Sequence, residues 1–366
     1  MSAPLSIDGR VIGQDAAPFI IAEMSGNHNQ SLDRALALVD AAADAGAHAV
    51  KLQTYTADTI TMPGAHRIDD AHSLWNGKEL HALYAEAHTP WQWHAPIFER
   101  ARERGLIAFS SPFDESAVDF LESLDVPAYK IASFENEHFP LMRRVVETGK
   151  PFIMSTGVIE QSALDHSVEY LRQLGADNFI LLKCTSTYPA TPELTNLRTI
   201  PDLAQRYGCQ VGLSDHTMGT GAAIAAVALG ATVIEKHFTL RRADGGVDSA
   251  FSLEPEEIAM LVSETERAWL AMGQVSYTLS ERERHQTVFK RSIYADRDMP
   301  VGHRIVEGDI RVVRPANGLH PKHFAAVHGQ VIRQAIAKGE PLTSGHVGDI
   351  ENPPRPASHE FTAAGG

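Results

Sequence analysis

Lysines and serines follow several short apolar runs in this sequence, at positions where they could bind an anion together. Two of the runs carry lysines near their ends, in Lys51-Leu52-Gln53 and Lys130-Ile131-Ala132-Ser133. Because an unpaired ammonium group is costly to bury, two such lysines predict an anionic ligand. Hydroxyl donors at the ends of these and other runs suit a phosphate and a carboxylate together. These hydroxyls belong to Ser111, Ser133, Ser155 and Ser214.

The lysines have two other interpretations that the residues alone leave open. Each lysine could pair with a neighbouring glutamate as a structural salt bridge. Lys130 could instead form a Schiff base with a carbonyl substrate, as the catalytic lysine does in one class of aldolase.

Two histidines, His216 and His237, end neighbouring apolar runs. If the runs are adjacent parallel strands, ~4.8 Å apart, both imidazoles could reach one ion. Two histidines completed by waters and substrate oxygens suit Mn²⁺ or a related divalent ion such as Mg²⁺. The remaining positions would stay open, as Lewis-acid catalysis needs. The alternative is that each histidine is a hydrogen-bonded core residue. His28 is expected to fix its own loop.

Carboxylates at the ends of the runs are candidates for proton transfer or for binding sugar hydroxyls. Glu23 and Glu135 are the candidates for this role. We expect Asp215 and Glu235 to have structural or supporting roles. Cys184 has no evident paired base and is expected to be a small buried residue.

The elements that position these residues are eight apolar runs separated by helical patterns. The runs are Phe19–Ser25, Ala49–Thr54, Ile107–Pro112, Ala128–Ser133, Pro151–Thr156, Asn178–Thr185, Cys209–His216 and Thr232–Thr239. Their nearly continuous apolar character predicts parallel strands that are covered on both faces. The predicted helices are Ser31–Ala45, one that opens at Thr89-Pro90 and ends at Gly105, Glu115–Leu124, Phe139–Thr148, Ser162–Leu174, Asn196–Tyr207, Gly221–Leu229 and Glu254–Met272.

Eight strands that alternate with eight helices predict an α/β fold of the (β/α)8 TIM-barrel type, with the active site at the carboxyl ends of the strands. A doubly wound open sheet is the alternative. The segment from Tyr55 to His88 is too long for a simple loop. It could cover the active site or be an insertion without a role.

The pattern changes after the barrel. We expect a catalytic barrel domain over residues 1–275, a linker over 276–288, a compact second domain over 289–349 and a disordered tail over 350–366.

Charge and composition exclude several classes of partner. The formal net charge of -14 disfavours nucleic acid and anionic membranes, although a few lysines in a cleft could still bind a small anion. No apolar run approaches the ~20 residues of a membrane helix, and no secretory signal is visible. Two cysteines, Cys184 and Cys209, fit a reducing compartment, so a cytoplasmic protein is expected.

The motifs also resemble those of a known family, the sialic acid synthases, in order and over nearly the whole chain. The matching motifs are Ile21-Ala22-Glu23-Met24-Ser25-Gly26-Asn27-His28-Asn29, Lys51-Leu52-Gln53-Thr54, Ser111-Pro112-Phe113, Tyr129-Lys130-Ile131-Ala132-Ser133, Ser155-Thr156-Gly157, Tyr188-Pro189, Ser214-Asp215-His216-Thr217 and Glu235-Lys236-His237-Phe238. Arg314-Pro315 and Asn317-Gly318-Leu319 resemble the family's C-terminal antifreeze-like (SAF) domain.

Within the family, the resemblance is closest to the pseudaminic acid branch. The runs that carry it are Glu23-Met24-Ser25-Gly26, Ala87-His88-Thr89-Pro90-Trp91 and Ser133-Phe134-Glu135, which lacks the glycine usual in the sialate branch. Ser186 stands where sialate-type members often have asparagine, which leaves its role open.

This resemblance implies a transferase that condenses phosphoenolpyruvate with open-chain 2,4-diacetamido-2,4,6-trideoxy-altropyranose and water. The products would be pseudaminic acid and phosphate, released by C–O cleavage of a tetrahedral intermediate. It implies a divalent metal on His216 and His237, and phosphoenolpyruvate on Lys51, Lys130 and the four serines.

The resemblance also assigns roles to the remaining site residues. Catalysis would involve Glu23, Lys130, Glu135 and Asp248, and the sugar would meet Gln53, Glu135, Tyr188, Asp248 and Arg314. Arg314 would reach the partner's barrel in a homodimer.

Three alternatives accompany this expectation. The first is an N-acetylneuraminate or legionaminate synthase that uses an N-acetylmannosamine-type sugar. The second is a 3-deoxy-sugar-acid phosphate synthase, which lacks such a C-terminal domain. The third is a catalytically inactive sugar-binding or ice-binding-like protein, which the many polar residues at the strand ends argue against.

Overall fold

The computed structural model of this protein describes residues 3–70 and 74–350. The chain forms two compact units, the first ending at Gly273 and the second beginning at Gln274. Each unit has a hydrophobic core of its own. Apart from Ile350, the predicted tail lies outside the described residues.

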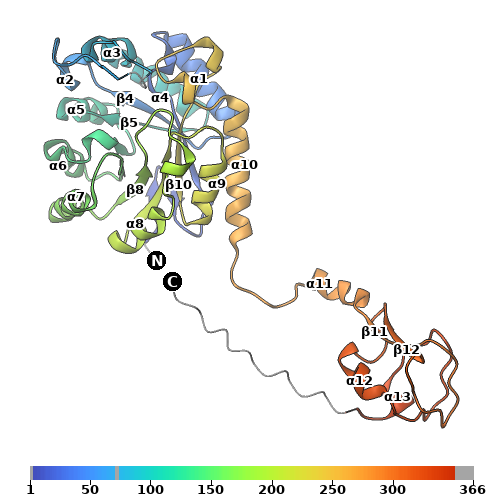
Figure 1. Cartoon of the computed structure of the whole chain (residues 1–366). Coiled ribbons are helices and arrows are strands. Elements are labelled where there is room, and N and C mark those ends of the chain that lie inside the picture. Colours follow the sequence, from blue (N-terminus) through green and yellow to red (C-terminus); the bar gives the residue numbers. More distant parts are fainter. Residues whose placement is uncertain (1–2, 71–73, 351–366) are drawn as a thin grey trace. The chain divides into compact units, whose positions relative to one another are not determined.

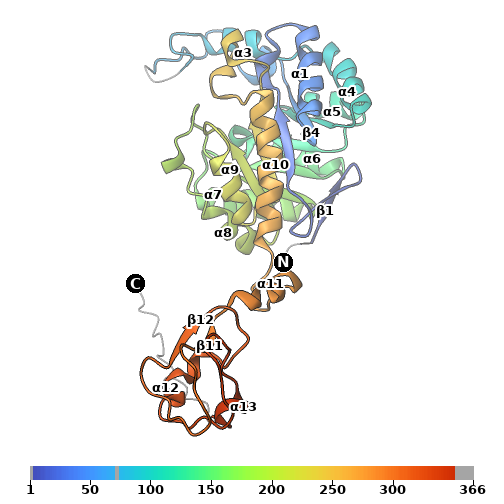
Figure 2. The ribbon, with the colours of Figure 1, turned by 90° about the vertical axis from the view of Figure 1, so that its right-hand side faces the viewer.

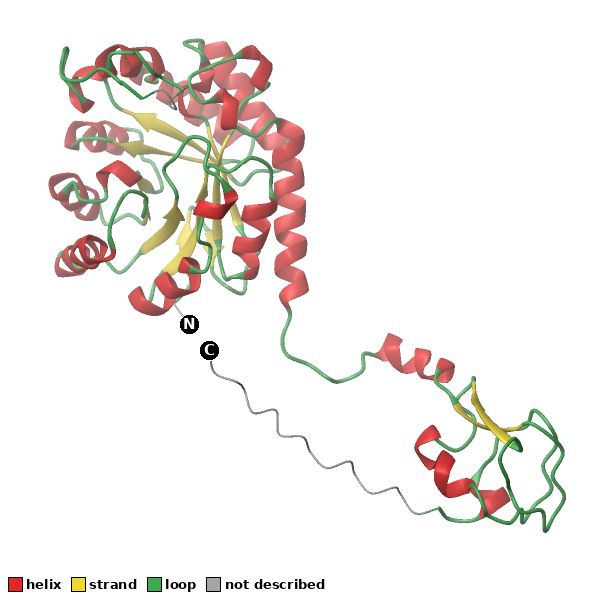
Figure 3. Ribbon diagram, viewed as in Figure 1, coloured by secondary structure: helices red, strands yellow, loops and turns green. Residues whose placement is uncertain are grey.

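Eight parallel strands in the first unit close into a barrel (Figures 1 and 3). The strands are β3 (Phe19–Glu23), β4 (Ala49–Thr54), β5 (Ile107–Pro112), β6 (Tyr129–Ile131), β7 (Phe152–Ser155), β8 (Phe179–Cys184), β9 (Gln210–Asp215) and β10 (Val233–His237). Each strand pairs with the next, and β10 pairs with β3, with His237 beside Glu23. This last pairing excludes the open sheet and confirms the predicted TIM barrel.

Helices surround the barrel and bury the outer faces of its strands. They are α1 (Leu32–Asp44), α4 (His94–Glu103), α5 (Glu115–Ser123), α6 (Phe139–Glu147), α7 (Gln161–Gln173), α8 (Thr199–Tyr207), α9 (Gly221–Ala228) and α10 (Pro255–Met272). Ser31 caps α1 by accepting a hydrogen bond from the Arg34 amide. Figure 2 shows α10 running along the barrel, where it packs on α9 and α1 and completes the ring.

The helix that was predicted to open at Thr89-Pro90 begins several residues later. Pro90 does not begin an α-helix but precedes a short 3₁₀ turn, η2 (Trp91–Trp93), and α4 follows from His94. A 3₁₀ turn is common at the start of an α-helix, and apolar periodicity does not distinguish the two.

An amino-terminal hairpin that the sequence analysis did not predict packs at the start of the barrel strands. It consists of β1 (Leu5–Ile7) and β2 (Arg10–Ile12), which pair antiparallel. Ile7 and Ile12 are fully buried in one cluster with Phe19 at the beginning of β3. The hairpin therefore contributes to the core at the end of the barrel opposite the predicted site.

The long segment between β4 and α4 is folded rather than a plain loop. It contains α2 (Ala57–Ile60) and α3 (Leu80–Ala87), which contact each other. The remaining short turns of the barrel unit are η1 (Ser25–His28), η3 (Ser133–Glu135), η4 (Pro192–Leu194), η5 (Arg242–Asp244) and η6 (Ser249–Phe251).

The second unit has little regular secondary structure around its apolar core. Its elements are α11 (Glu281–Gln286), η7 (Thr287–Phe289), β11 (Ser292–Ala295), β12 (Ile310–Val313), η8 (Pro321–His323), α12 (Phe324–Val327) and α13 (Ser344–Val347). A short helix, α11, lies within the predicted linker, and Ser280 caps it. No helix in the described part of the chain is long and apolar enough to cross a membrane.

Candidate active site

Alternation along the strands determines which end residues enter the barrel. Side chains two positions apart on a strand share a face. Two such pairs line one cavity of about 400 Å³ at the carboxyl ends of the strands: Lys51 and Gln53 on β4, and Glu235 and His237 on β10. Glu23 on β3 and Ser214 on β9 also line it, together with Ser25 and His216, which follow those strands. The residues between them face away, and Lys236 pairs there with Asp215 at 2.9 Å.

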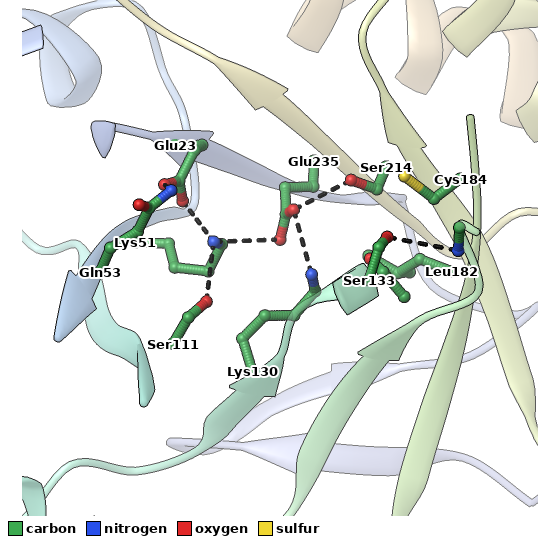
Figure 4. A network of polar contacts seen from close by, with 12 residues as sticks. Glu23, Lys51, Gln53, Ser111, Lys130, Ser133, Leu182, Cys184, Ser214 and Glu235 are labelled. Carbon is green, nitrogen blue, oxygen red and sulfur yellow. Dashed lines mark hydrogen bonds and ion pairs between the residues drawn. The ribbon is translucent and has the colours of Figure 1, made fainter. Parts of the chain in front are cut away.

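A network of buried charges forms the floor of this cavity (Figure 4). Lys51 Nζ lies 2.5 Å from Glu23 Oε2 and 3.1 Å from Ser111 Oγ. Glu235 joins the two lysines, with its carboxylate oxygens 3.4 Å from Lys130 Nζ and 3.8 Å from Lys51 Nζ. Two ammonium groups thus share two carboxylates, so the network is close to neutral without a ligand.

This pairing matches the geometry expected for structural salt bridges. The same groups can also bind an anion, because carboxylate pairing is what keeps a buried lysine charged before a ligand arrives. Burial lowers the pKa of Lys51, but Glu23 and Glu235 more than offset this and raise it. Burial lowers the pKa of Lys130 despite Glu235. Burial also raises the pKa of Glu23, against the effect of Lys51.

Hydroxyl groups gather around the loop after β7. The Ser133 hydroxyl oxygen accepts a hydrogen bond from the Gly157 amide at 3.2 Å. The Ser155 hydroxyl is buried without a hydrogen-bond partner and lines the cavity. A Cβ atom added at Gly157 would collide with the hydroxyls of Ser186 and Ser133. A larger residue at this position would therefore have to displace these hydroxyls, of which that of Ser133 lines the cavity.

The two histidines face each other across the cavity, with ring centroids 5.3 Å apart. His216 Nδ1 lies 3.0 Å from the Thr185 carbonyl oxygen, which can only accept, so Nδ1 carries the proton and Nε2 keeps its lone pair. His237 Nδ1 is buried without a hydrogen-bond partner, 3.9 Å from Asp248 Oδ2. Burial lowers the pKa of His237 well below its usual value, and the nearby ammonium group of Lys51 acts in the same direction.

These two imidazoles fit a divalent cation. A neutral His237 and an oriented His216 each offer a nitrogen lone pair, as metal binding requires. Burial lowers the pKa of His216, but Cys184 and the Thr185 carbonyl raise it overall, so a cation there would compete with a proton. Among the described residues, no three or more of His, Cys, Asp and Glu form a metal-binding group, so most positions around a bound ion would be open.

The residues predicted to face the sugar do not all reach the cavity. Gln53, Tyr188 and Asp248 line it, and Gln53 Nε2 donates to Glu23 Oε1 at 3.0 Å. Glu135 is not part of the lining, because the η3 turn directs its neighbour Phe134 there instead. Burial raises the pKa of Glu135 to about 7, and its Oε2 atom has no hydrogen-bond partner. Arg314 belongs to the second unit, directly after β12.

The chain is similar to known proteins over most of its length. Residues 38–277 match the NeuB family, and residues 290–347 match the SAF domain. The chain belongs to the NeuB family. The pseudaminic acid synthase of Campylobacter jejuni subsp. jejuni serotype O:2 is 41% identical over 90% of this chain and 97% of that protein. The pseudaminic acid synthase of Helicobacter pylori is 37% identical over 89% of this chain and 97% of that protein.

A solved structure of this family is similar as well. The N-acetylneuraminic acid synthetase of Leptospira borgpetersenii, determined with citrate, has a TM-score of 0.71 and 32% identity over 78% of this chain and 95% of that chain. Together these comparisons confirm the family resemblance of the motifs and the SAF domain after the barrel.

Several cavity residues of this NeuB-family chain were missed by reasoning from the sequence. Glu235 was expected to have a structural or supporting role, and it joins both lysines; its spacing of two from His237 was the signal for its place in the cavity. Further lining residues that were not assigned to the site include Ser25, Tyr55, Trp75, Leu83, Tyr84 and Phe113. Most of them come from or adjoin the segment 55–88, which therefore lines the cavity rather than being an insertion without a role.

Proposed function

We propose that this protein is a pseudaminic acid synthase. It would condense phosphoenolpyruvate with 2,4-diacetamido-2,4,6-trideoxy-altrose in its open-chain form and with water, giving pseudaminic acid and phosphate. The observation that carries the proposal is one cavity with two lysines and four serines beside two opposed histidines. The similarity to pseudaminic acid synthases over almost the full length of both chains supports the choice of sugar.

Phosphoenolpyruvate would bind over the charged floor. Lys51 and Lys130 would face its phosphate and carboxylate groups, and hydroxyls would donate the remaining hydrogen bonds. Those hydroxyls belong to Ser111, Ser133, Ser155 and Ser214. Its arrival would loosen the ion pairs that Glu23 and Glu235 make with the lysines.

The sugar aldehyde would lie next to the histidines. His216 and His237 would hold a divalent ion, Mn²⁺ or Mg²⁺, whose contribution is to polarise the aldehyde oxygen. Gln53, Tyr188 and Asp248 would orient the sugar by hydrogen bonds. Glu135 would act on the sugar from beside the cavity once the substrate is bound.

The bond changes follow from this arrangement. C3 of phosphoenolpyruvate attacks the aldehyde carbon, and the aldehyde oxygen gains a proton to become a hydroxyl. Water adds to the cationic C2, with Glu23 positioned to orient it and to accept its proton. The C2–O bond then breaks, phosphate leaves with the bridging oxygen, and the product keeps a 2-keto acid group.

Two finer features belong to the same proposal. A homodimer would place the second unit over the partner's barrel, so that Arg314 contacts sugar bound in the other protomer. A cytoplasmic location, without nucleic-acid or membrane partners, fits substrates of this kind.

Phosphate release by the purified protein tests the function. We expect release with phosphoenolpyruvate and the altrose derivative, and much slower release with N-acetylmannosamine. Faster turnover of N-acetylmannosamine would contradict the proposal in favour of a sialate-type synthase. Reduction with cyanoborohydride during turnover should trap no substrate on Lys130; a trapped adduct detected by mass spectrometry would favour the Schiff-base mechanism.

A further inference from the structure

The segment between β4 and α4 supplies the cavity with an apolar wall. Its lining side chains include Ile68, Trp75, Leu80 and Leu83, and Phe113 extends the same wall from the loop after β5. The polar groups that the segment adds to the lining are the exposed His66 and the hydroxyls of Tyr55 and Tyr84. This wall therefore contrasts with the charged floor, where the reaction would take place.

Aromatic rings join the wall to the barrel. The Tyr55 ring lies edge-on to Tyr84 and to Phe113, at centroid distances of 5.5 and 5.1 Å. The Trp75 indole N–H donates to the Val247 carbonyl at 3.1 Å, beside Asp248. Because that donor is already used, Trp75 presents to the cavity mainly its apolar ring, 5.8 Å from the Tyr188 ring.

Helix α3, which carries Leu80 and Leu83, is held tightly against the turn after β3. A Cβ atom at Gly26 would lie 3.2 Å from the Ala87 carbonyl oxygen, so the helix approaches as closely as a glycine allows. Gln30 Nε2 donates to the carbonyls of Glu86 and His88 at 2.9 and 2.8 Å. The wall is thus formed in advance of binding and does not need the substrate to assemble it.

We propose that this wall determines sugar specificity by binding a methyl group of the substrate, an inference that rests on the proposed function. The main residues of the wall are Leu80, Leu83 and Trp75. The candidates are the methyl at C6 and the methyl of the 4-acetamido group. A hydroxyl placed against these side chains would lose its hydrogen bonds to water without gaining new ones. Sugars with hydroxyls at these positions would therefore be rejected.

The test compares three sugars with phosphoenolpyruvate: the altrose derivative, its 6-hydroxy analogue and its 4-amino analogue without the acetyl group. The variants are Leu80→Asn and Leu83→Asn, and Leu194→Asn is the control, an exposed leucine outside the cavity. We expect each wall variant to lower kcat/KM for the altrose derivative by roughly 10- to 100-fold, with the KM for phosphoenolpyruvate unchanged. The analogue that lacks the bound methyl should be affected less than threefold, because the variant and the analogue would remove the same contact.

The outcomes are distinguishable. Unchanged sugar discrimination in wall variants that melt like the wild type would overturn this inference alone. Leu80 is only partly buried, so its variant tests the inference even where Leu83→Asn fails to fold; Trp75→Phe gives a second, milder change. Wild-type protein that releases no phosphate with any of the three sugars would overturn the proposed function and this inference with it.

Discussion

Glu235 is the residue on which the charge balance of the cavity depends. Its Oε1 atom lies 3.4 Å from Lys130 Nζ and accepts from Ser214 Oγ at 3.1 Å, and its Oε2 atom lies 3.8 Å from Lys51 Nζ. Burial raises its pKa, but the two lysines lower it below the usual value. An anionic substrate would therefore meet lysines that already pair with carboxylates, and it would have to displace those carboxylates to bind.

Replacing His237 with alanine tests the role of the opposed histidines. We expect His237→Ala to reduce turnover about 1,000-fold, because several kcal/mol of charge stabilisation would be lost. The melting temperature should stay close to that of the wild type. Titration calorimetry with Mn²⁺ should show weaker binding by the variant, whereas His285→Ala, on the exposed helix α11, should bind like the wild type. Wild-type-like Mn²⁺ binding and turnover in His237→Ala would refute the metal role.

Glu135 should make the stability of the barrel depend on pH. Its pKa is about 7 in the folded protein and 4.5 in an ordinary environment, so the folded state holds the proton more tightly. The stability contributed by the protonated form is present below about pH 4.5 and is lost as pH rises to about 7.

Substitution by glutamine removes this effect. The melting temperature of Glu135→Gln, relative to the wild type, should rise as pH increases from 5 to 8. Glu137→Gln, which changes an exposed neighbour, is the matched control. A difference for Glu135→Gln that is the same at every pH would show that its carboxyl is not held protonated by burial.

At the scale of elements, apolar patterning predicted the strands that are buried on both faces and missed several short strands and helices. Runs such as Ala49–Thr54 and Ile107–Pro112 correspond to β4 and β5 residue for residue, because helices cover both strands from outside. The hairpin strand β1, with three residues, and α2, with four, offer too few positions for a period to show.

The site residues were also predictable only in part, because only some of them contrast with their neighbours in the sequence. Polar residues that interrupt apolar strands, such as Lys51 and Ser214, can be recognised in the sequence because they differ from the apolar residues around them. The directions of side chains in 3₁₀ turns are not visible in this way, so Glu135 was expected to face the cavity although Phe134 does. The apolar residues of segment 55–88 do not differ in this way from their neighbours, so the apolar wall of the cavity is evident only from the fold.

A side chain at Gly157 should disturb the loop after β7. A methyl group there would collide with the hydroxyls of Ser133 and Ser186, so Gly157→Ala must displace the Ser133 hydroxyl, which is proposed to bind phosphoenolpyruvate. We expect the KM for phosphoenolpyruvate to rise at least about tenfold, the effect of losing one hydrogen bond to a charged group. Gly221→Ala, where nothing lies within 4 Å of the added atom, is the control. An unchanged KM for phosphoenolpyruvate would place the phosphate elsewhere.

At the scale of the whole molecule, the chain combines a barrel with a separately folded SAF domain. The second unit has its own core, which includes Ile293, Ile305 and Ile332 at 1% exposure or less. Such a unit can act as a rigid carrier of Arg314. A shared site between two protomers would then be a property of the dimer rather than of either chain.

Mixing two inactive variants tests this shared site. Arg314→Ala and His237→Ala should each be impaired alone, because each lacks one part of every site. In an equal mixture, half of the dimers are hybrids with one complete site, so about a quarter of wild-type activity should return. Phosphate release before and after subunit exchange measures this. No recovery, with exchange verified by differently tagged chains, would mean that Arg314 acts within its own chain or has no role.

Condensation of phosphoenolpyruvate with the altrose derivative should proceed by C–O cleavage. Phosphoenolpyruvate carrying ¹⁸O in its bridging position tests this most directly, with mass spectrometry of both products. We expect a nine-carbon 2-keto acid without label and inorganic phosphate that carries the label. Label retained in the sugar acid, or phosphate formed without any condensation product, would contradict it.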